Sequence, residues 1–101
     1  MKLDVLSFQD TIDSSSPILV KFEASWCGPC KAYAPVFEQF AKENQDIKCH
    51  TVDCEEMRDI AVEYGIMSIP CTILFKDGKD INRKLGELSI QEIKDLYDCK
   101  L

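Results

Sequence analysis

The sequence predicts an α/β fold: a three-layer α/β/α sandwich with a central mixed sheet of five strands and with four helices. The main observation is that strand-like blocks, rich in β-branched and aromatic residues, alternate along the chain with helix-like blocks. Such alternation is typical of a sheet whose first strands pair in parallel and whose faces carry helices. A second observation is the turn "KDGK" (76–79), which predicts that the last two strands form an antiparallel hairpin.

The N-terminal quarter predicts two strands around one short helix. "KLDVL" (2–6) is a candidate strand, and Ser7 is a candidate cap for a helix that ends near Ile12. "PILVKFEAS" (17–25) is rich in β-branched and aromatic residues and therefore predicts a second strand.

A longer helix is expected from about Pro29 to Asn44, because apolar residues recur there at helical spacing. Pro29 suits the first turn, where its missing N–H costs little, whereas Pro35 lies inside the helix and should kink it. The recurring apolar positions are Tyr33, Val36, Phe37, Phe40 and Ala41.

The middle of the chain predicts one more strand–helix pair. "IKCHTVD" (47–53) is the strand, and a helix should follow from about Glu55 to Tyr64 and stop at Gly65. The acids that precede and begin this helix would suit its positive N-terminal end.

The last part of the chain predicts the hairpin and a final helix. "CTILF" (71–75) and "INRKL" (81–85) are the two strands of the hairpin. Ser89 caps the last helix. Its buried stripe is expected to be Ile90, Ile93, Leu96 and Tyr97.

Length, composition and charge limit the possible functions. We expect a single domain over residues 1–101, because the chain is short and has the 46% apolar and 30% charged residues of an ordinary globular protein. A net charge of −6 disfavours nucleic acid and anionic membrane surfaces as partners. The N-terminus has no sustained apolar run, and no segment reaches the ~20 apolar residues of a membrane span. We therefore expect a cytoplasmic protein, and a monomer, in a reducing compartment.

Two of the six cysteines, Cys27 and Cys30, stand close together in "CGPC". Cys27 falls where a predicted strand gives way to a helix, and unpaired N–H groups and the helix dipole favour a negative charge there. Such placement typically lowers a thiol pKa from ~8.5 into the range ~3.5 to 7.5. Cys30 lies one turn along, close enough to form a small ring with Cys27, and Pro29 stiffens the bridge. The pair predicts thiol–disulfide exchange, in which Cys27 attacks a disulfide and Cys30 resolves the mixed disulfide.

A zinc site is the alternative interpretation of a C-x-x-C pair, and it is disfavoured. Zinc needs two further ligands, usually a second such pair or paired histidines, and the chain has only His50. Cys49 and Cys54 would point to opposite faces of a strand. We therefore expect no metal.

The pentapeptide "WCGPC" (26–30) resembles the active-site motif of the thioredoxins. The resemblance covers almost the whole chain. "PILVKFEASWCGPCKAYAPVFEQFA" is similar to the strand and kinked helix around that motif, "YGIMSIPCTILFKDGK" to the segment that holds the family's cis-proline, and "LGELS" to its glycine before the last helix. The resemblance implies the thioredoxin fold and a protein-disulfide reductase.

The resemblance also implies roles for single residues. Cys27 matches the nucleophile and Cys30 the resolving thiol, which together form the redox disulfide. Ile69 and Pro70 match the cis peptide that faces the cysteines, whereas the residues alone favour a trans bond before Pro70. The flat apolar rim that accepts protein disulfides is matched by Trp26, Gly28, Pro29, Ile69, Pro70 and Gly86.

Lys21 departs from the family pattern. Most thioredoxins have a buried aspartate at this position, thought to take the proton of the resolving thiol. A buried ammonium is costly, so Lys21 should have a lowered pKa, reach water, or pair with a carboxylate, of which Glu23 on the same strand face is the nearest candidate. With such a pair, water or Glu23 would accept the proton. The alternative hypothesis is an altered redox poise, in which the cation stabilises the reduced dithiolate and makes the protein a weaker reductant.

The other cysteines have simpler interpretations. Cys71, where the family usually has threonine, is expected to be inert packing, and the alternative is a third thiol that captures Cys30 or helps to hold a metal or an iron–sulfur cluster. Cys49, Cys54 and Cys99 are expected to be structural or surface thiols.

The expected function is reduction of disulfides in client proteins. No nucleotide-binding glycine pattern is present, so we expect no bound cofactor, and electrons would come from a separate NADPH-dependent thioredoxin reductase. One alternative is a binding module that keeps the fold and the apolar rim but not the redox chemistry, which the intact motif disfavours. Another is an oxidising or isomerising domain of the secretory pathway, which the missing signal and Pro29 disfavour.

Overall fold

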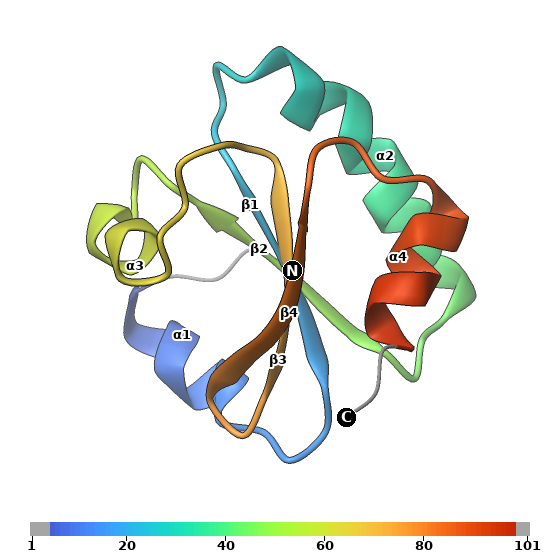
Figure 1. Ribbon diagram of the computed structural model, residues 1–101, viewed down its shortest axis with the longest axis horizontal. Coiled ribbons are helices and arrows are strands. Elements are labelled where there is room, and N and C mark those ends of the chain that lie inside the picture. Colours follow the sequence, from blue (N-terminus) through green and yellow to red (C-terminus); the bar gives the residue numbers. More distant parts are fainter. Residues whose placement is uncertain (1–4, 99–101) are drawn as a thin grey trace.

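The computed structural model of the protein describes residues 5–98 and has three layers, with a sheet between two pairs of helices (Figure 1). The strands are β1 (Ile18–Glu23), β2 (Lys48–Asp53), β3 (Cys71–Lys76) and β4 (Lys79–Leu85). The helices are α1 (Val5–Ile12), α2 (Gly28–Glu43), α3 (Arg58–Glu63) and α4 (Ile90–Tyr97). Helices α1 and α3 cover one face of the sheet, and α2 and α4 cover the other. The predicted three-layer α/β fold is confirmed.

The sheet is mixed, with the strand order β2-β1-β3-β4. Strand β1 pairs with β2 in parallel and with β3 antiparallel, and β3 and β4 form the predicted hairpin. Asp77 and Gly78 make its two-residue turn with φ values of 54° and 78°, a conformation that suits a glycine and that asparagine or aspartate tolerates. Strand β3, which follows Pro70, therefore lies between β1 and β4 in the sheet.

The predicted first strand is wrong in the part that the structure describes. Val5 and Leu6, expected to be strand, begin α1, and Ser7 lies inside that helix rather than at its cap. Residues 2–4 lie outside the described residues, and residues 5–98 contain four strands instead of five. A short apolar run cannot distinguish strand from helix. Phe8 and Ile12, four residues apart and both buried, fix the helical period.

The predicted helix from Glu55 is shorter than expected. Residues 54–57 form turns, and α3 begins only at Arg58. The side-chain oxygen Oδ1 of Asp53 accepts the backbone N–H of Glu55 at 2.8 Å and of Glu56 at 3.3 Å, so this carboxylate stabilises a turn where a helix was expected. Gly65 follows the helix with φ of 64°, as the predicted stop requires.

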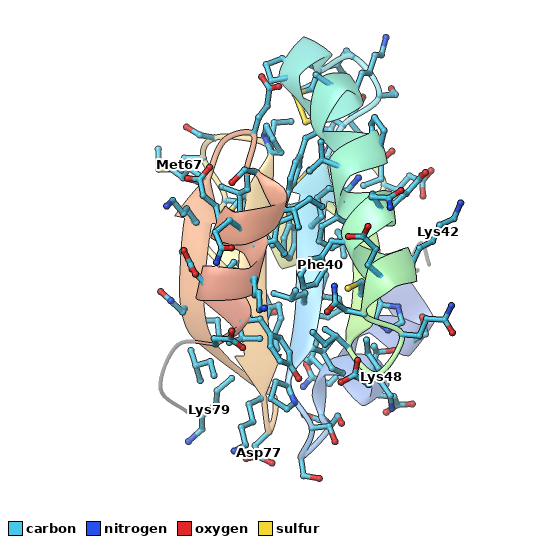
Figure 2. All side chains as sticks on the ribbon, turned by 90° about the vertical axis from the view of Figure 1, so that its right-hand side faces the viewer. Phe40, Lys42, Lys48, Met67, Asp77 and Lys79 are labelled. Carbon is cyan, nitrogen blue, oxygen red and sulfur yellow. A yellow bond between two sulfur atoms is a disulfide. The ribbon has the colours of Figure 1, made fainter. Side chains whose placement is uncertain are left out.

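Alternate residues of β1 divide the hydrophobic core between the two faces. Ile18, Val20 and Phe22 pack in the cluster on the α1 and α3 side, whereas Leu19 packs in the cluster on the α2 and α4 side. Figure 2 shows Phe40 pointing from α2 toward the sheet, where its side chain is fully buried. The second cluster therefore fixes α2, which carries both cysteines of the motif, on the central strand.

The last helix has the predicted cap. The Ser89 hydroxyl accepts the backbone N–H of Glu92 at 3.1 Å, and the Glu92 carboxylate accepts the N–H of Ser89 at 3.1 Å, which completes a capping box. Of the predicted stripe, Ile93 and Leu96 are buried, and Ile90 and Tyr97 are partly buried against the same cluster.

Candidate active site

Cys27 lies at the junction between the end of β1 and the start of α2, as its predicted chemistry requires. It is the N-cap residue of α2, with an extended backbone, and its sulfur accepts the backbone N–H of Cys30 at 3.2 Å. Pro29 lies in the first turn, and Gly28 is the first helical residue. A sulfur at this position faces N–H groups that the helix itself leaves unpaired, and the helix dipole adds positive potential there. This environment favours the thiolate form of Cys27.

Cys27 and Cys30 are joined by a disulfide, with their Cα atoms 5.2 Å apart. Both side chains are buried, and they form a small cluster with Ala24 and the partly buried Ile69. A two-residue spacer at a helix start thus brings the two sulfurs to bonding distance.

The segment before β3 faces the cysteine pair. The peptide bond between Ile69 and Pro70 is cis, and the Cys27 sulfur lies 3.9 Å from the carbonyl oxygen of Ile69. Gly86, with φ of 91°, donates its N–H to the carbonyl oxygen of Pro70 at 2.8 Å. This hydrogen bond ties the end of β4 to the proline segment, so that Ile69, Pro70 and Gly86 form one continuous border beside Cys27.

Exposed apolar side chains accompany this border. Trp26 is 68% exposed, Met67 96% and Leu85 57%. Met67 and Leu85 line a cavity of about 370 Å³ together with Ser68, Cys71 and other residues. Trp26 was predicted to be part of the rim, and Met67 was expected to be a core or rim residue, but Leu85 was not predicted. Leu85 directly precedes Gly86 in the chain, which is the signal that could have found it.

Lys21 is buried and pairs with Glu23. The ammonium nitrogen Nζ of Lys21 lies 2.7 Å from Oε1 of Glu23, and the two side chains are 4% and 27% exposed. The Lys21 ammonium also lies 5.4 Å from the ring centroid of Phe37 and 5.9 Å from that of Tyr33, both on α2. Of the three outcomes expected for Lys21, the structure shows the one in which it pairs with a carboxylate.

The remaining described cysteines have environments unlike that of Cys27. Burial raises the pKa of the Cys49 thiol and of the Cys54 thiol from 9.0 to about 11. Cys49 packs against the cluster on the α2 and α4 side and Cys54 against the opposite one, so the two thiols lie on different faces as predicted. Cys99 lies outside the described residues.

Cys71 is fully buried in the cluster on the α1 and α3 side. Burial raises the pKa of its thiol, which the positive charge of Arg83 only partly offsets. The disulfide belongs to a different cluster, with Ala24 and Ile69. This arrangement is that of a packing residue.

A buried hydrogen bond between α2 and β3 was missed by the sequence analysis. The Tyr33 hydroxyl lies 2.9 Å from Oγ1 of Thr72. Burial raises the pKa of Tyr33 to about 12, although the hydrogen bond to Thr72 acts in the opposite direction. The helical period places Tyr33 in the core, but the partner of its hydroxyl is set by the packing of α2 on the sheet.

Neither a metal-binding cluster nor a membrane-spanning helix occurs among the residues that the structure describes. Within residues 5–98, no group of three or more His, Cys, Asp or Glu side chains is placed to hold a metal ion. None of the helices that the structure describes is both long and apolar enough to cross a membrane.

The fold and the cysteine pair together define a thiol–disulfide oxidoreductase of the three-layer α/β class. The chain belongs to the thioredoxin family: the family model described as Thioredoxin matches residues 1–98. Thioredoxin 1 of Synechococcus elongatus is 42% identical over 94 residues, which are 92% of this chain and 88% of the relative. A thioredoxin of Mycoplasmoides gallisepticum is 38% identical over 85 residues, 84% of this chain and 85% of the relative.

Solved structures agree with this assignment. The crystal structure of a Malassezia sympodialis thioredoxin superposes with a TM-score of 0.86 at 28% identity, covering 94% of this chain and 88% of the other. The matches thus extend to the arrangement of the whole fold around the cysteine pair.

Proposed function

We propose that this thiol–disulfide oxidoreductase works as a reductant of protein disulfides, with Cys27 as the nucleophile and Cys30 as the resolving thiol. The observation that carries the proposal is that Cys27 is the N-cap of α2 and its sulfur accepts the Cys30 N–H. The same contact that stabilises a disulfide sulfur weakly would stabilise a thiolate strongly, because hydrogen bonds to charged acceptors are about twice as strong.

The proposed reaction transfers two electrons in two exchange steps. The Cys27 thiolate attacks one sulfur of the client disulfide, and the other client sulfur leaves and takes up a proton. Cys30 then loses its proton, attacks the Cys27 sulfur and breaks its bond to the client, whose second sulfur leaves and is protonated. The protein ends in the disulfide form, and the client ends as a dithiol.

The border beside Cys27 supports docking of an extended client segment. The Ile69 carbonyl, 3.9 Å from the Cys27 sulfur, would accept a strand-like hydrogen bond from the backbone of such a segment. Trp26, which directly precedes Cys27 and is exposed, would add an apolar contact. Because backbone hydrogen bonds and apolar contacts require few particular client side chains, such a site would accept many client sequences.

Regeneration of the dithiol requires an external electron source. We assign this role to a separate NADPH-dependent thioredoxin reductase, and clients are disulfide-containing proteins of a reducing compartment, the cytoplasm. Thioredoxins generally interact with such a reductase and such substrates, and the family membership supports this part of the proposal.

Reduction of insulin in the presence of dithiothreitol tests the proposed function. The native protein should accelerate the precipitation of insulin chains, and the Cys27→Ser variant should not. The Cys30→Ser variant should accumulate as a mixed disulfide with insulin, visible on a non-reducing gel. Equal rates for the native protein and Cys27→Ser would favour a binding module without redox work.

A further inference from the structure

The resolving step requires a group that accepts the thiol proton of Cys30. Cys30 must lose its thiol proton before it can attack the mixed disulfide, because only the thiolate is a nucleophile. Its side chain is only 2% exposed, so bulk water has little access to this proton. Its backbone N–H points at the Cys27 sulfur, which is an acceptor and which removes no proton from Cys30 in this step.

One cavity connects Cys30 to a carboxylate. It has a volume of about 290 Å³ and lies between the end of β1 and the first two turns of α2. Cys30 lines it from the helix and Glu23 from the strand. Among the described residues that line this cavity, Glu23 carries the only carboxylate; the others are Ala24, Ser25, Lys31 and Ala34. The space admits either direct approach of the Glu23 side chain or a bridging water.

The partner of Glu23 fixes its carboxylate at this place. Lys21 precedes it by two residues and therefore projects from the same face of β1, toward α2. Its ammonium is 2.7 Å from Oε1 of Glu23 and is enclosed by the rings of Phe37 and Tyr33. A buried cation without a carboxylate would be very unfavourable, so the ion pair holds the Glu23 carboxylate at the wall of this cavity.

We infer that Glu23 is the general base of the resolving step and that Lys21 positions it. The inference rests on the proposed function. The Glu23 carboxylate takes the proton from Cys30 as the Cys30 sulfur forms its bond to Cys27 and the bond between Cys27 and the client sulfur breaks. The departing client thiolate then recovers the proton from Glu23, directly or through water. No electron acceptor other than the client disulfide is needed, and Glu23 ends in its starting state.

Stopped-flow reaction of the reduced protein with 5,5′-dithiobis(2-nitrobenzoate) separates the two steps. Attack by Cys27 releases the first thionitrobenzoate, and resolution by Cys30 releases the second. The Cys27→Ser variant gives the signal of the other thiols, which is subtracted. If the proposed function fails, the fast first phase is missing. If only the present inference fails, that phase remains and the second phase does not respond to Glu23.

The variant Glu23→Gln removes the base but leaves an amide oxygen to accept from Lys21. We expect the rate of its second phase to fall by about tenfold or more, while the rate of the first phase is nearly unchanged. For comparison, a general base typically contributes ~10²–10⁴ to a rate. Imidazole buffer should accelerate the second phase of this variant in proportion to its concentration, and Glu23→Asp should recover part of the native rate. A purely structural role of Glu23 predicts no rescue by buffer.

Glu38→Gln is the matched control, because it makes the same change on an exposed position of α2. The double variant Lys21→Gln with Glu23→Gln removes both charges of the pair, so that Lys21 is not left as a buried unpaired cation, and it serves if the single variant does not fold. It should show the same slow, imidazole-dependent second phase. A second phase in Glu23→Gln or the double variant that equals that of Glu38→Gln, with no dependence on imidazole, would overturn the inference.

Discussion

The Tyr33 hydroxyl lies 2.9 Å from Oγ1 of Thr72 and joins the helix that carries both cysteines to the strand that follows Pro70. Thr72 is fully buried, as is Tyr33. This buried polar contact thus connects the two halves of the active site, one on α2 and one before β3.

The variant Tyr33→Phe should destabilise the protein by about 1–3 kcal/mol, because it leaves the buried Thr72 hydroxyl without this partner. Thr72→Val should cost a similar amount for the same reason. The double variant removes both polar groups, so its loss should be smaller than the sum of the two single losses. Urea unfolding of the four proteins measures these differences. Additive losses would show that the contact contributes nothing.

The buried thiols should make the reduced protein less stable in alkali. The pKa of Cys49 and of Cys54 is raised from 9.0 to about 11, so between these values an unfolded chain has lost protons that the folded chain retains. Their contribution is fully present below pH 9.0 and is lost as pH rises through 11. Urea unfolding of the reduced protein over this range should show falling stability. The decline should be shallower in a variant with both Cys49→Ala and Cys54→Ala; an identical decline would contradict the assignment.

The charge at position 21 should influence the redox potential. Lys21→Asp replaces a compensated ion pair with two neighbouring acids, and the added negative charge disfavours thiolates in the reduced state. We expect a lower reduction potential, measured by equilibration with glutathione buffers. Lys42→Asp makes the same change in charge in the last turn of α2, about 20 Å along the helix from the cysteines at its start (Figure 2). This variant should therefore shift the reduction potential less. An unchanged potential in Lys21→Asp would remove the hypothesis of an altered redox poise.

The fold was predictable wherever local pattern and tertiary packing agree. The strands 18–23 and 71–76, the long helix and the final hairpin have clear periods and turn residues, and the structure has them at nearly the predicted bounds. The prediction was wrong at Val5 and Leu6, where a run of two apolar residues is compatible with both strand and helix. It was also wrong at Glu55, where the Asp53 carboxylate stabilises a turn.

The active-site sequence signals were of unequal strength. The spacing of Cys27 and Cys30 at a strand–helix junction predicts their chemistry directly, because helix geometry alone places them. The pairing of Lys21 with Glu23 followed from strand periodicity. The Tyr33–Thr72 contact and the cavity shared by Cys30 and Glu23 join residues that are distant or on different elements, and no local pattern encodes them.

The central claim, that the N-cap position activates Cys27, is tested most directly by alkylation of the reduced protein with iodoacetamide as a function of pH. Mass spectrometry of peptides distinguishes Cys27 from Cys49, Cys54 and Cys71. We expect the Cys27 rate to reach half of its maximum at a pH at least about one unit below the ~8.5 of an unperturbed thiol. Cys49, Cys54 and Cys71 should react slowly throughout the neutral range, because burial raises the pKa of each of these thiols. A half-maximal rate for Cys27 at or above ~8.5 would contradict the account.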